Sequence, residues 1–356
     1  MTIKPITIMN TESQLGDLED PKLKKIGQRA VRQMALAASR VAAHDADGKR
    51  FPLPAQRDSI ETTLAAWFDT MPAGRKAAAA KDAVQQLTTL SVLRSSFGEL
   101  SKIDLTASTS VASQASSIPL PNLEFTAAEI AKLTAISHGG GLSPQLERSN
   151  RLRLRVNKVW CANETNSPFV GEAGRDDMWV GGTSVDETGD TVKEPPIKLG
   201  QFDNKQTKTY SPPLEFANFN ITEGSAFPKS YLVTLVLCEK DDGKKFKQYL
   251  DKIQEAIKQE VRKELLKAGV DFGPIGIILA EIAAWCFGEL VDYISSGWKD
   301  TVFRPVTVRA NIGGYEAVWN DTKRKDSKNR MLQTKAPAAR YQLWYDWQLY
   351  SGTGPE

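Results

Sequence analysis

The chain has few of the residues that usually carry nucleophilic or metal chemistry. Its 356 residues include two histidines, His44 and His138, and three cysteines. The cysteines are widely spaced and form no C-x-x-C pair, which argues against a disulfide framework, a zinc site or a redox site. Cys238 and Cys286 lie in apolar runs, as is typical of buried, unreactive thiols.

Recognisable catalytic motifs are also lacking. The chain contains no Walker A sequence, no G-x-G-x-x-G, no H-E-x-x-H and no G-x-S-x-G. The HGGG run at residues 138–141 is similar to an oxyanion-hole loop of some α/β-hydrolases, but the nucleophile elbow and the βαβ pattern that such a loop needs are missing. The run therefore indicates an ordinary loop, and we expect a protein without catalytic activity.

Neither one sign of charge nor a long apolar run dominates the sequence. Forty-six Lys and Arg residues oppose 43 Asp and Glu residues, and a net charge of +3 gives no indication of nucleic-acid binding. The first residues, MTIKPITIMNTESQ, hold no apolar core and no cleavage signature of a Sec signal peptide. We expect a cytoplasmic location, or export by a signal-free route.

The first part of the chain has the periodicity of α-helices. Apolar residues between Leu23 and Val41 recur every three or four positions. Asp58 and Glu61 have the spacing of a capping box at the start of a second helix, and a third helical pattern follows Pro72. The sequence thus predicts a helical N-terminal region over residues 1–105.

Polar segments flank these helices. Residues 1–20 are predicted to form an arm, and residues 106–149 to form a Ser/Thr/Ala-rich linker that buries little apolar surface. Within the linker, Thr126 and Glu129 have capping-box spacing and open a short helix.

From residue 151 the period changes from that of helices to that of strands. In RLRLRVNKVW, apolar residues alternate with Arg, so Leu152, Leu154 and Val156 share one face. Further strand-like runs, bounded by Gly, Pro, Asn and Asp, are 178–185, 191–199, 208–210, 214–221, 231–238, 302–311, 315–319 and 341–350. This spacing predicts an antiparallel β-sandwich over residues 150–356.

The last of these runs, YQLWYDWQLY, is rich in aromatic residues. Period two places Trp344 and Tyr350 on one face and five apolar or aromatic residues on the other. A buried face explains the larger set, whereas an exposed aromatic face would suit a carbohydrate or a partner surface.

Two helical patterns interrupt the strands and predict an inserted αα-hairpin over residues 244–297. The first, 244–268, is amphipathic, and the second, 274–295, carries Glu281 as its one charge between residues 275 and 288. Either the second helix is buried against the sandwich, or the hairpin unlatches and inserts in a membrane. The candidate membrane or partner contacts are Ile275, Ile278, Leu279 and Trp285.

Acidic residues lie at the ends of two predicted strands. Asp176 and Asp177 precede one strand, and Glu239, Asp241 and Asp242 follow another. Carboxylates on the loops of a sandwich can chelate Ca²⁺, which takes six to eight oxygen ligands. The same residues can instead cap a helix or stabilise turns. These five residues are our candidate metal site, with calcium as the candidate cofactor.

The stretch from residue 151 to 182, RLRLRVNKVWCANETNSPFVGEAGRDDMWVGG, resembles the opening of a C2-type β-sandwich. In that family an acidic loop and an S-D-P-Y-V-like strand start follow the first strand, as RDDMWV does here at 175–180. A second acidic loop follows an apolar strand, as EKDDG does at 239–243. Met178 replaces the usual Pro, and Lys240 interrupts the second acidic group. The resemblance covers about 151–350 and implies phospholipid binding, often through Ca²⁺ held between the loops.

The sequence therefore predicts an α+β fold, in which a helical N-terminal region precedes a C2-like β-sandwich with an inserted hairpin. It predicts a non-catalytic binding protein whose partner is a phospholipid surface or another protein, and not a nucleic acid. One alternative is a membrane-active toxin or secreted effector, whose segment 244–297 inserts in lipid. Another is a structural or assembly subunit that associates through its N-terminal helices.

Overall fold

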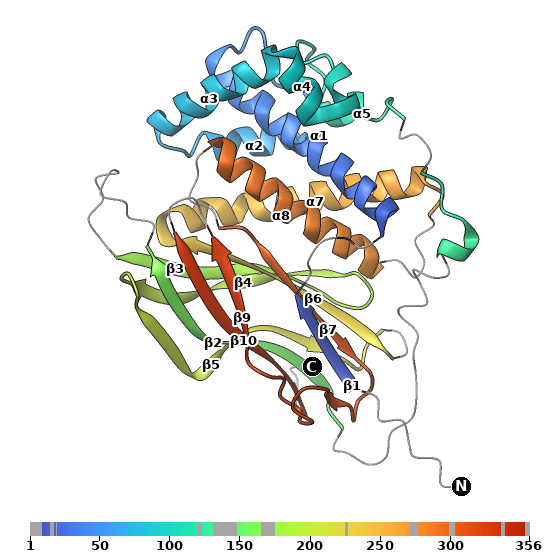
Figure 1. Ribbon diagram of the computed structural model, residues 1–356, viewed down its shortest axis with the longest axis vertical. Coiled ribbons are helices and arrows are strands. Elements are labelled where there is room, and N and C mark those ends of the chain that lie inside the picture. The colour runs from blue at the N-terminus through green and yellow to red at the C-terminus, as the bar shows by residue number, and fades with distance from the viewer. Residues whose placement is uncertain are drawn as a thin grey trace.

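The computed structural model describes residues 9–14, 18, 20–119, 123–130, 148–164, 175–224, 227–270, 276–298, 303–335 and 339–352. They form four layers: the N-terminal helices, a helical hairpin, a six-stranded sheet and a four-stranded sheet (Figure 1). The predicted α+β class is confirmed, with the helical region first in the chain and the two sheets after it.

The two sheets pack face to face. The order in the first sheet is β4 (Thr191–Phe202), β3 (Asp176–Val185), β6 (Lys229–Glu239), β7 (Val306–Ile312), β1 (Met9–Gln14) and β8 (Val318–Trp319). The order in the second is β5 (Thr207–Asn220), β2 (Arg151–Asn163), β10 (Arg340–Tyr350) and β9 (Arg330–Lys335). Neighbouring strands are antiparallel, except that β1 and β8 are parallel.

Period-two alternation builds the core between the sheets. Every second residue is buried along β10 and along most of β2, as the sequence predicts, with one shift of the pattern at residues 157–158 of β2. The largest buried side chains of this core are aromatic and include Tyr231, Trp319, Tyr341 and Trp347. Each such ring buries about 150–250 Å², so these residues dominate the hydrophobic stabilisation of the sandwich.

Two strands, β1 and β9, lie where the sequence predicts no strand, and β1 falls within the predicted arm of residues 1–20. β1 has the polar sequence MNTESQ and pairs with β7 from Thr11 opposite Asn311 to Gln14 opposite Val308. β9 follows the basic run of residues 323–330 and pairs with β10. MNTESQ shows no apolar alternation, so its sequence does not predict a strand. β1 forms because its main chain bonds to a neighbouring strand.

The helices cover only one face of the sandwich (Figure 1). The N-terminal layer contains a short 3₁₀ turn (Gly98–Lys102) and the helices α1 (Pro21–Ala46), α2 (Ile60–Phe68), α3 (Ala73–Thr88), α4 (Leu90–Phe97) and α5 (Val111–Ala115). The hairpin consists of α7 (Lys240–Lys267) and α8 (Gly276–Trp298), close to the predicted bounds. It lies between the N-terminal helices and the six-stranded sheet.

One continuous apolar core joins both helical layers to the outer face of the six-stranded sheet. It includes residues of α1, α2, α3, α7 and α8 together with Leu232 and Val236 of β6. This shared core joins the N-terminal helices to the part of the chain after residue 150. The division into residues 1–105, 106–149 and 150–356 stays a prediction. Among the described residues, none of the helices combines the length and hydropathy needed to cross a bilayer.

Arg40 of α1 holds the Ser/Thr/Ala-rich stretch against the helices. Its guanidinium donates to the carbonyl oxygens of Thr109, at 2.7 Å, and Ala107. It also lies 3.7 Å from Glu61, and both side chains are fully buried. Residues 106–118 are thus packed on α1. Their main-chain oxygens accept hydrogen bonds from the buried guanidinium, whose charge would be costly to bury without such partners.

Glu61 does not form the capping box that the sequence predicts. The N-cap of α2 is Ser59, whose hydroxyl accepts from the Thr62 N–H at 3.3 Å. Glu61 points inward and accepts from the Val111 N–H at 2.7 Å. Burial raises the pKa of the Glu61 carboxyl, against the opposing effects of that N–H and of Arg40.

Gly27 sets the distance between α1 and α8. A Cβ at this position would lie 2.8 Å from Cζ3 of Trp285, closer than real contacts allow. We expect Gly27→Ala to destabilise the fold by about 1 kcal/mol, because overpacking outweighs the better helix propensity of Ala. The measurement is the free energy of unfolding in urea.

Gly74→Ala in α3 is the matched control, because a Cβ there meets nothing within 4 Å. It should stabilise the fold by about 0.5–1 kcal/mol through helix propensity alone. Equal stabilisation by both variants would contradict the close packing of α1 on α8.

Candidate functional site

The two acidic segments lie side by side at one end of the six-stranded sheet. β3 and β6 are antiparallel neighbours, and Met178 lies opposite Glu239. Because of this register, the start of β3 adjoins the end of β6, and α7 begins directly after it. The main chain therefore brings the segments together, and the directions of the side chains decide what they can bind.

Asp176 and Asp177 point to opposite faces of the sheet. Asp176 is fully buried in the sandwich, and its Oδ2 accepts from the Tyr341 hydroxyl at 2.6 Å. Burial and this carboxylate raise the pKa of Tyr341, and burial raises the pKa of the nearby Cys161 thiol to about 11. Asp177 lies on the other face, 3.3 Å from Lys198 Nζ. At most one of the two can join a site outside the sandwich.

The remaining acids lie where β6 passes into α7. Glu239 ends β6 and is half-buried, and Asp241 and Asp242 belong to the first turn of α7, where carboxylates stabilise a helix. The side chains of Asp241 and Asp242 lie outside the described part of the structure. Among the described residues, no group of three His, Cys, Asp or Glu side chains is placed to hold a metal ion. Calcium binding stays a prediction that depends on Glu239, Asp241 and Asp242.

The candidate membrane contacts of the hairpin are largely inside the fold. Ile278 and Leu279 are buried, and Trp285 is half-buried against Gly27. Ile275 lies outside the described residues. A membrane contact through Ile278 or Leu279 would thus require the hairpin to leave its place between the layers.

Ion pairs hold the acids of α8 in that place. Glu281 pairs with Arg309 of β7, and Arg304 reaches both Glu289, at 2.8 Å, and Asp292. These carboxylates would be costly inside a bilayer, and in the folded chain each has a cation beside it.

Among the described residues, no helix packs on the four-stranded sheet, whose outer face points away from the helical layers (Figure 1). On this face, cations stack on aromatic rings across neighbouring strands. Lys158 Nζ lies 3.7 Å from the ring centre of Trp344, and the Arg153 guanidinium lies 4.5 Å from that of Tyr350. The sequence placed Trp344 and Tyr350 on a common face, but not the cations, because strand pairing is not visible in the alternation pattern.

Carboxylates pair with two cations of this face. Arg153 lies 2.7 Å from Glu215, and Arg155 pairs with Asp346 at 2.7 Å and with Asp326 at 2.8 Å. Trp160 lies opposite Gln342 on the adjoining strand. The face thus combines ordered cations with half-exposed rings, a chemistry that suits anionic and apolar groups at once.

Searches against protein-family models, curated proteins and solved structures found no match to this chain. The assignment of a site therefore rests on the geometry described above.

A calcium site at the junction of β6 and α7 would stabilise the folded chain by mass action. At about one hundred times its dissociation constant a ligand adds about 2.7 kcal/mol. We expect millimolar Ca²⁺ to raise the melting temperature of the wild-type chain, and we expect Asp241→Asn with Asp242→Asn to remove that increase.

Asp176→Asn is the control, because Asp176 is engaged with Tyr341 inside the sandwich. This variant should melt at a lower temperature but keep the increase caused by Ca²⁺. A melting temperature that Ca²⁺ leaves unchanged, or an increase that survives in the double variant, would remove calcium from the account.

Proposed function

We propose that this chain is a non-catalytic binding protein with a C2-like sandwich, and that it docks on an anionic phospholipid surface through the open face of its four-stranded sheet. The observation that carries the proposal is the pairing of Lys158 with Trp344 and of Arg153 with Tyr350. Tryptophan and tyrosine rings favour the level of the lipid headgroups, and each Lys or Arg near an anionic membrane contributes about 1 kcal/mol.

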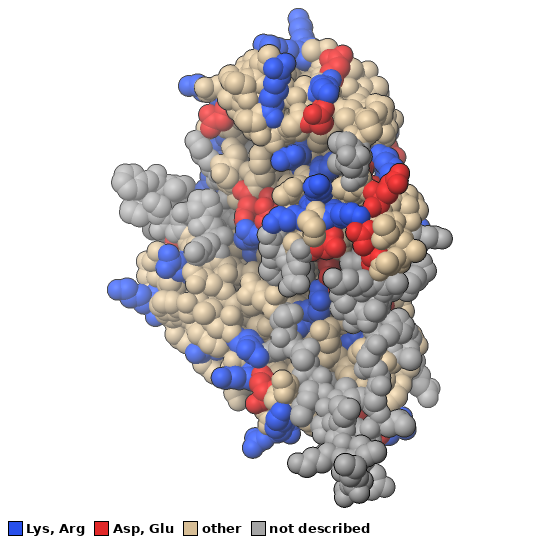
Figure 2. All heavy atoms as spheres, turned by 45° about the vertical axis from the view of Figure 1, so that its right-hand side comes forward, with Lys and Arg blue, Asp and Glu red and all other residues tan. Residues whose placement is uncertain are grey.

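The distribution of charge supports binding through one local surface rather than through a general attraction of the whole chain to polyanions. Acidic and basic side chains are interspersed over the helical half of the face seen in Figure 2. With a net charge of +3, binding must come from an ordered group of cations and rings. Calcium at Glu239, Asp241 and Asp242 would lie at the end of the other sheet, so the bridge to lipid phosphates that the resemblance to C2 domains implies would be a separate contact.

Vesicle co-sedimentation tests the proposal. We expect binding to phosphatidylserine-containing vesicles, weaker binding at high salt, and little binding to pure phosphatidylcholine. Lys158→Glu should lower the affinity for the anionic vesicles about tenfold, since the reversal replaces an attraction by a repulsion.

Lys49→Glu is the matched control, because Lys49 is exposed on the helical half and carries the same charge change. Equal loss in both variants, or equal binding to neutral vesicles, would contradict the assigned face. Parallel runs with Ca²⁺ and with a chelator separate the contribution of calcium, and release of a trapped dye would favour the hairpin-insertion alternative instead.

A protein partner on the same face is the second candidate, and Met331 of β9 favours it. This apolar side chain is 44% exposed and lies opposite Trp344. A folded wild-type chain that binds neither anionic nor neutral vesicles would direct attention to this partner class.

The assembly role also has an observation in its favour, at the far end of the molecule. Leu90 and Val92 of α4 are 56% and 40% exposed. If α4 forms a contact between copies, Leu90→Glu with Val92→Glu should convert an oligomer into a monomer in size-exclusion chromatography with light scattering. A wild-type chain that is already monomeric would remove this role.

A further inference from the structure

A row of buried threonines crosses the outer face of the six-stranded sheet beneath the helical hairpin. Strand pairing places Thr183 of β3 opposite Thr234 of β6, and Thr234 opposite Thr307 of β7. The three side chains are only 7%, 4% and 6% exposed. On the same face of β6, the flanking residues Leu232 and Val236 belong to the apolar core. Three hydroxyls thus interrupt a surface that packing alone would make apolar.

A glycine lets β3 and β6 approach each other beside this row. The pairing of β3 with β4 shifts its register between Val180 and Gly182. A Cβ on Gly182 would overlap the carbonyl oxygen of Thr234, so a larger residue does not fit there. An irregularity of this kind re-aims the side chains next to it, so the main chain fixes the position of Thr183.

A cavity of about 330 Å³ lies over one end of the row, between the sheet and the hairpin. Thr183 and Thr234 line it from the sheet, and Gln254 lines it from α7. Its apolar side consists of Val185 and of three alanines of α8, namely Ala280, Ala283 and Ala284. The cavity is thus polar on one side and apolar on the other, and its size is at the low end of the range of about 300–1,000 Å³ typical of small-molecule sites.

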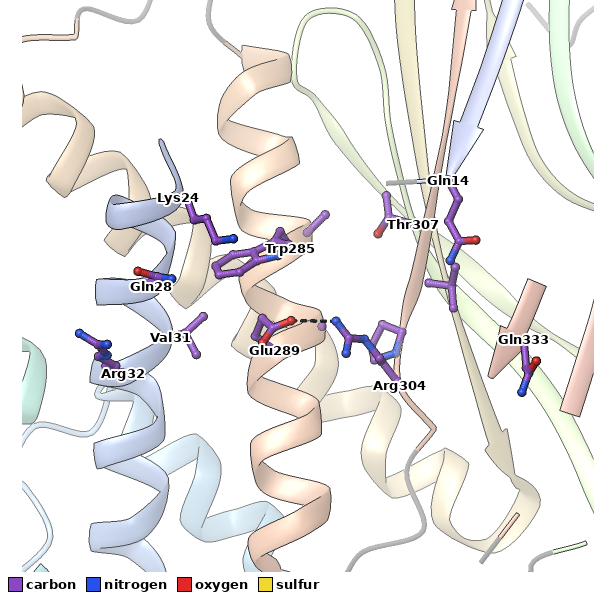
Figure 3. A pocket seen from close by; sticks show the side chains of 14 residues that line it. Gln14, Lys24, Gln28, Val31, Arg32, Trp285, Glu289, Arg304, Thr307 and Gln333 are labelled. Atoms are coloured by element: carbon purple, nitrogen blue, oxygen red, sulfur yellow. Dashed lines mark hydrogen bonds and ion pairs between the residues drawn. The ribbon is translucent and has the colours of Figure 1, made fainter. Parts of the chain in front are cut away.

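The other end of the row reaches a larger cavity, of about 640 Å³, beside Trp285. Figure 3 shows Thr307 on the sheet side of this larger cavity and Trp285 on the side of α8. Between the two cavities, the hydroxyls of Thr234 and Thr307 bond each other at 2.9 Å. A hydroxyl pair therefore bounds the smaller cavity on this side.

Hydrogen-bonding groups around the smaller cavity are left over. The amide Nε2 of Gln254 donates to the Thr183 hydroxyl at 3.3 Å, so Thr183 keeps its own O–H to donate. In the pair of Thr234 and Thr307, the hydroxyl that accepts likewise keeps its proton to donate. Gln254 Oε1 is buried and has no hydrogen-bond partner among the described residues. A buried amide oxygen without a donor is costly, and an N–H or O–H group of a ligand would remove that cost.

The charged residues at the mouth of this cavity favour neither sign of ligand. Lys193 and Glu255 are exposed there, and Lys193 already has an interaction partner. Lys258 donates to the Thr191 hydroxyl at 3.3 Å and to a main-chain oxygen of the β3–β4 loop at 3.2 Å. Glu255 accepts from Gln259 at 2.5 Å. The groups left for a ligand are therefore neutral, namely hydroxyls and an amide.

We propose that the smaller cavity binds a small neutral molecule that carries an apolar ring and an amide or hydroxyl group. The ring lies against the alanines of α8, and the polar group lies toward Thr183, Thr234 and Gln254. The ligand both donates to the free amide oxygen and accepts from the threonine hydroxyls. This site is distinct from the outer face of the four-stranded sheet, and the proposal does not depend on lipid binding.

Calorimetry with three matched probes tests the preference for a neutral ligand. Benzamide, benzoate and benzamidinium share one ring and one planar shape and differ in charge. We expect saturable binding of benzamide at one site per chain, in the millimolar range of a small fragment, unaffected by salt and at least about tenfold tighter than that of the two ions. Equal affinities for all three probes, or no binding of benzamide at about 10 mM, would overturn the proposal.

A threonine variant locates the polar end of the site. Thr183→Val keeps the shape of the side chain but removes its hydroxyl, and it should weaken benzamide about tenfold. Thr334→Val is the matched control, because Thr334 is a threonine of β9 that is 2% exposed and does not line the cavity. Equal loss of affinity in both variants would contradict the assigned site.

Ala283→Leu tests the apolar end, because the larger side chain would fill the cavity from α8. We expect benzamide binding to be lost while the melting temperature and the far-UV circular dichroism stay close to those of the wild-type chain. If Thr183→Val does not fold, Ala283→Leu decides the proposal alone. Unchanged affinity in folded Thr183→Val and Ala283→Leu chains would overturn it.

Discussion

The layered structure depends on one constraint, namely that α8 is apolar on most of its sides and that these sides must be covered. Ile282, Phe287, Leu290 and Ile294 are fully buried. A helix of this kind is stable in water only between two other surfaces. The six-stranded sheet supplies one surface, and α1 with α7 supplies the other. Because α8 is inserted between two strands of the sandwich, its burial joins the N-terminal region to the sandwich.

Buried charges fix how these layers are oriented. Arg29 of α1 lies 3.3 Å from Glu264 of α7, with side chains that are 5% and 1% exposed. It also donates to the carbonyl oxygens of Ala115 and Ile118, and Arg40 does the same for Thr109. Such pairs add little net stability, because desolvation offsets their attraction. Their geometry instead selects one arrangement, since any other leaves a buried charge without its partners.

The sequence predicts those features whose cause is local and misses those whose cause lies in distant residues. Alternation along 151–160 and 341–350 predicts β2 and β10 with their buried faces, because one face of each strand meets the core. β1 has no such alternation and exists because β7 offers a free edge. The Ser/Thr/Ala-rich stretch has the composition of a linker, yet its carbonyl oxygens are needed by Arg29 and Arg40.

The candidate acidic site shows the same division. The convergence of β3 and β6 follows from antiparallel pairing, which the strand pattern predicts. The separation of Asp176 from Asp177 also follows from period two, once the strand is extended two residues before Met178. The cavity at Trp285 could not be predicted, because Lys24, Trp285 and Arg304 come from three distant parts of the chain.

Packing around α8 is unequal, and this bears on whether the hairpin can act alone. Toward α1 the contact is close: Gly27 lies against Trp285, and its carbonyl oxygen accepts from the Cys286 thiol at 3.4 Å. Toward the sheet, Ala280 and Ala284 face threonines across a cavity of about 330 Å³, whereas a larger cavity is shared by α1, α8 and residues 304–307. The hairpin therefore packs more closely with the N-terminal helices than with the sandwich. If the layers separated, the contacts between α8 and the sheet would be lost first, and α1 would stay packed on α8. Insertion of the hairpin alone into a membrane would also require the loss of the closer contacts between α8 and α1.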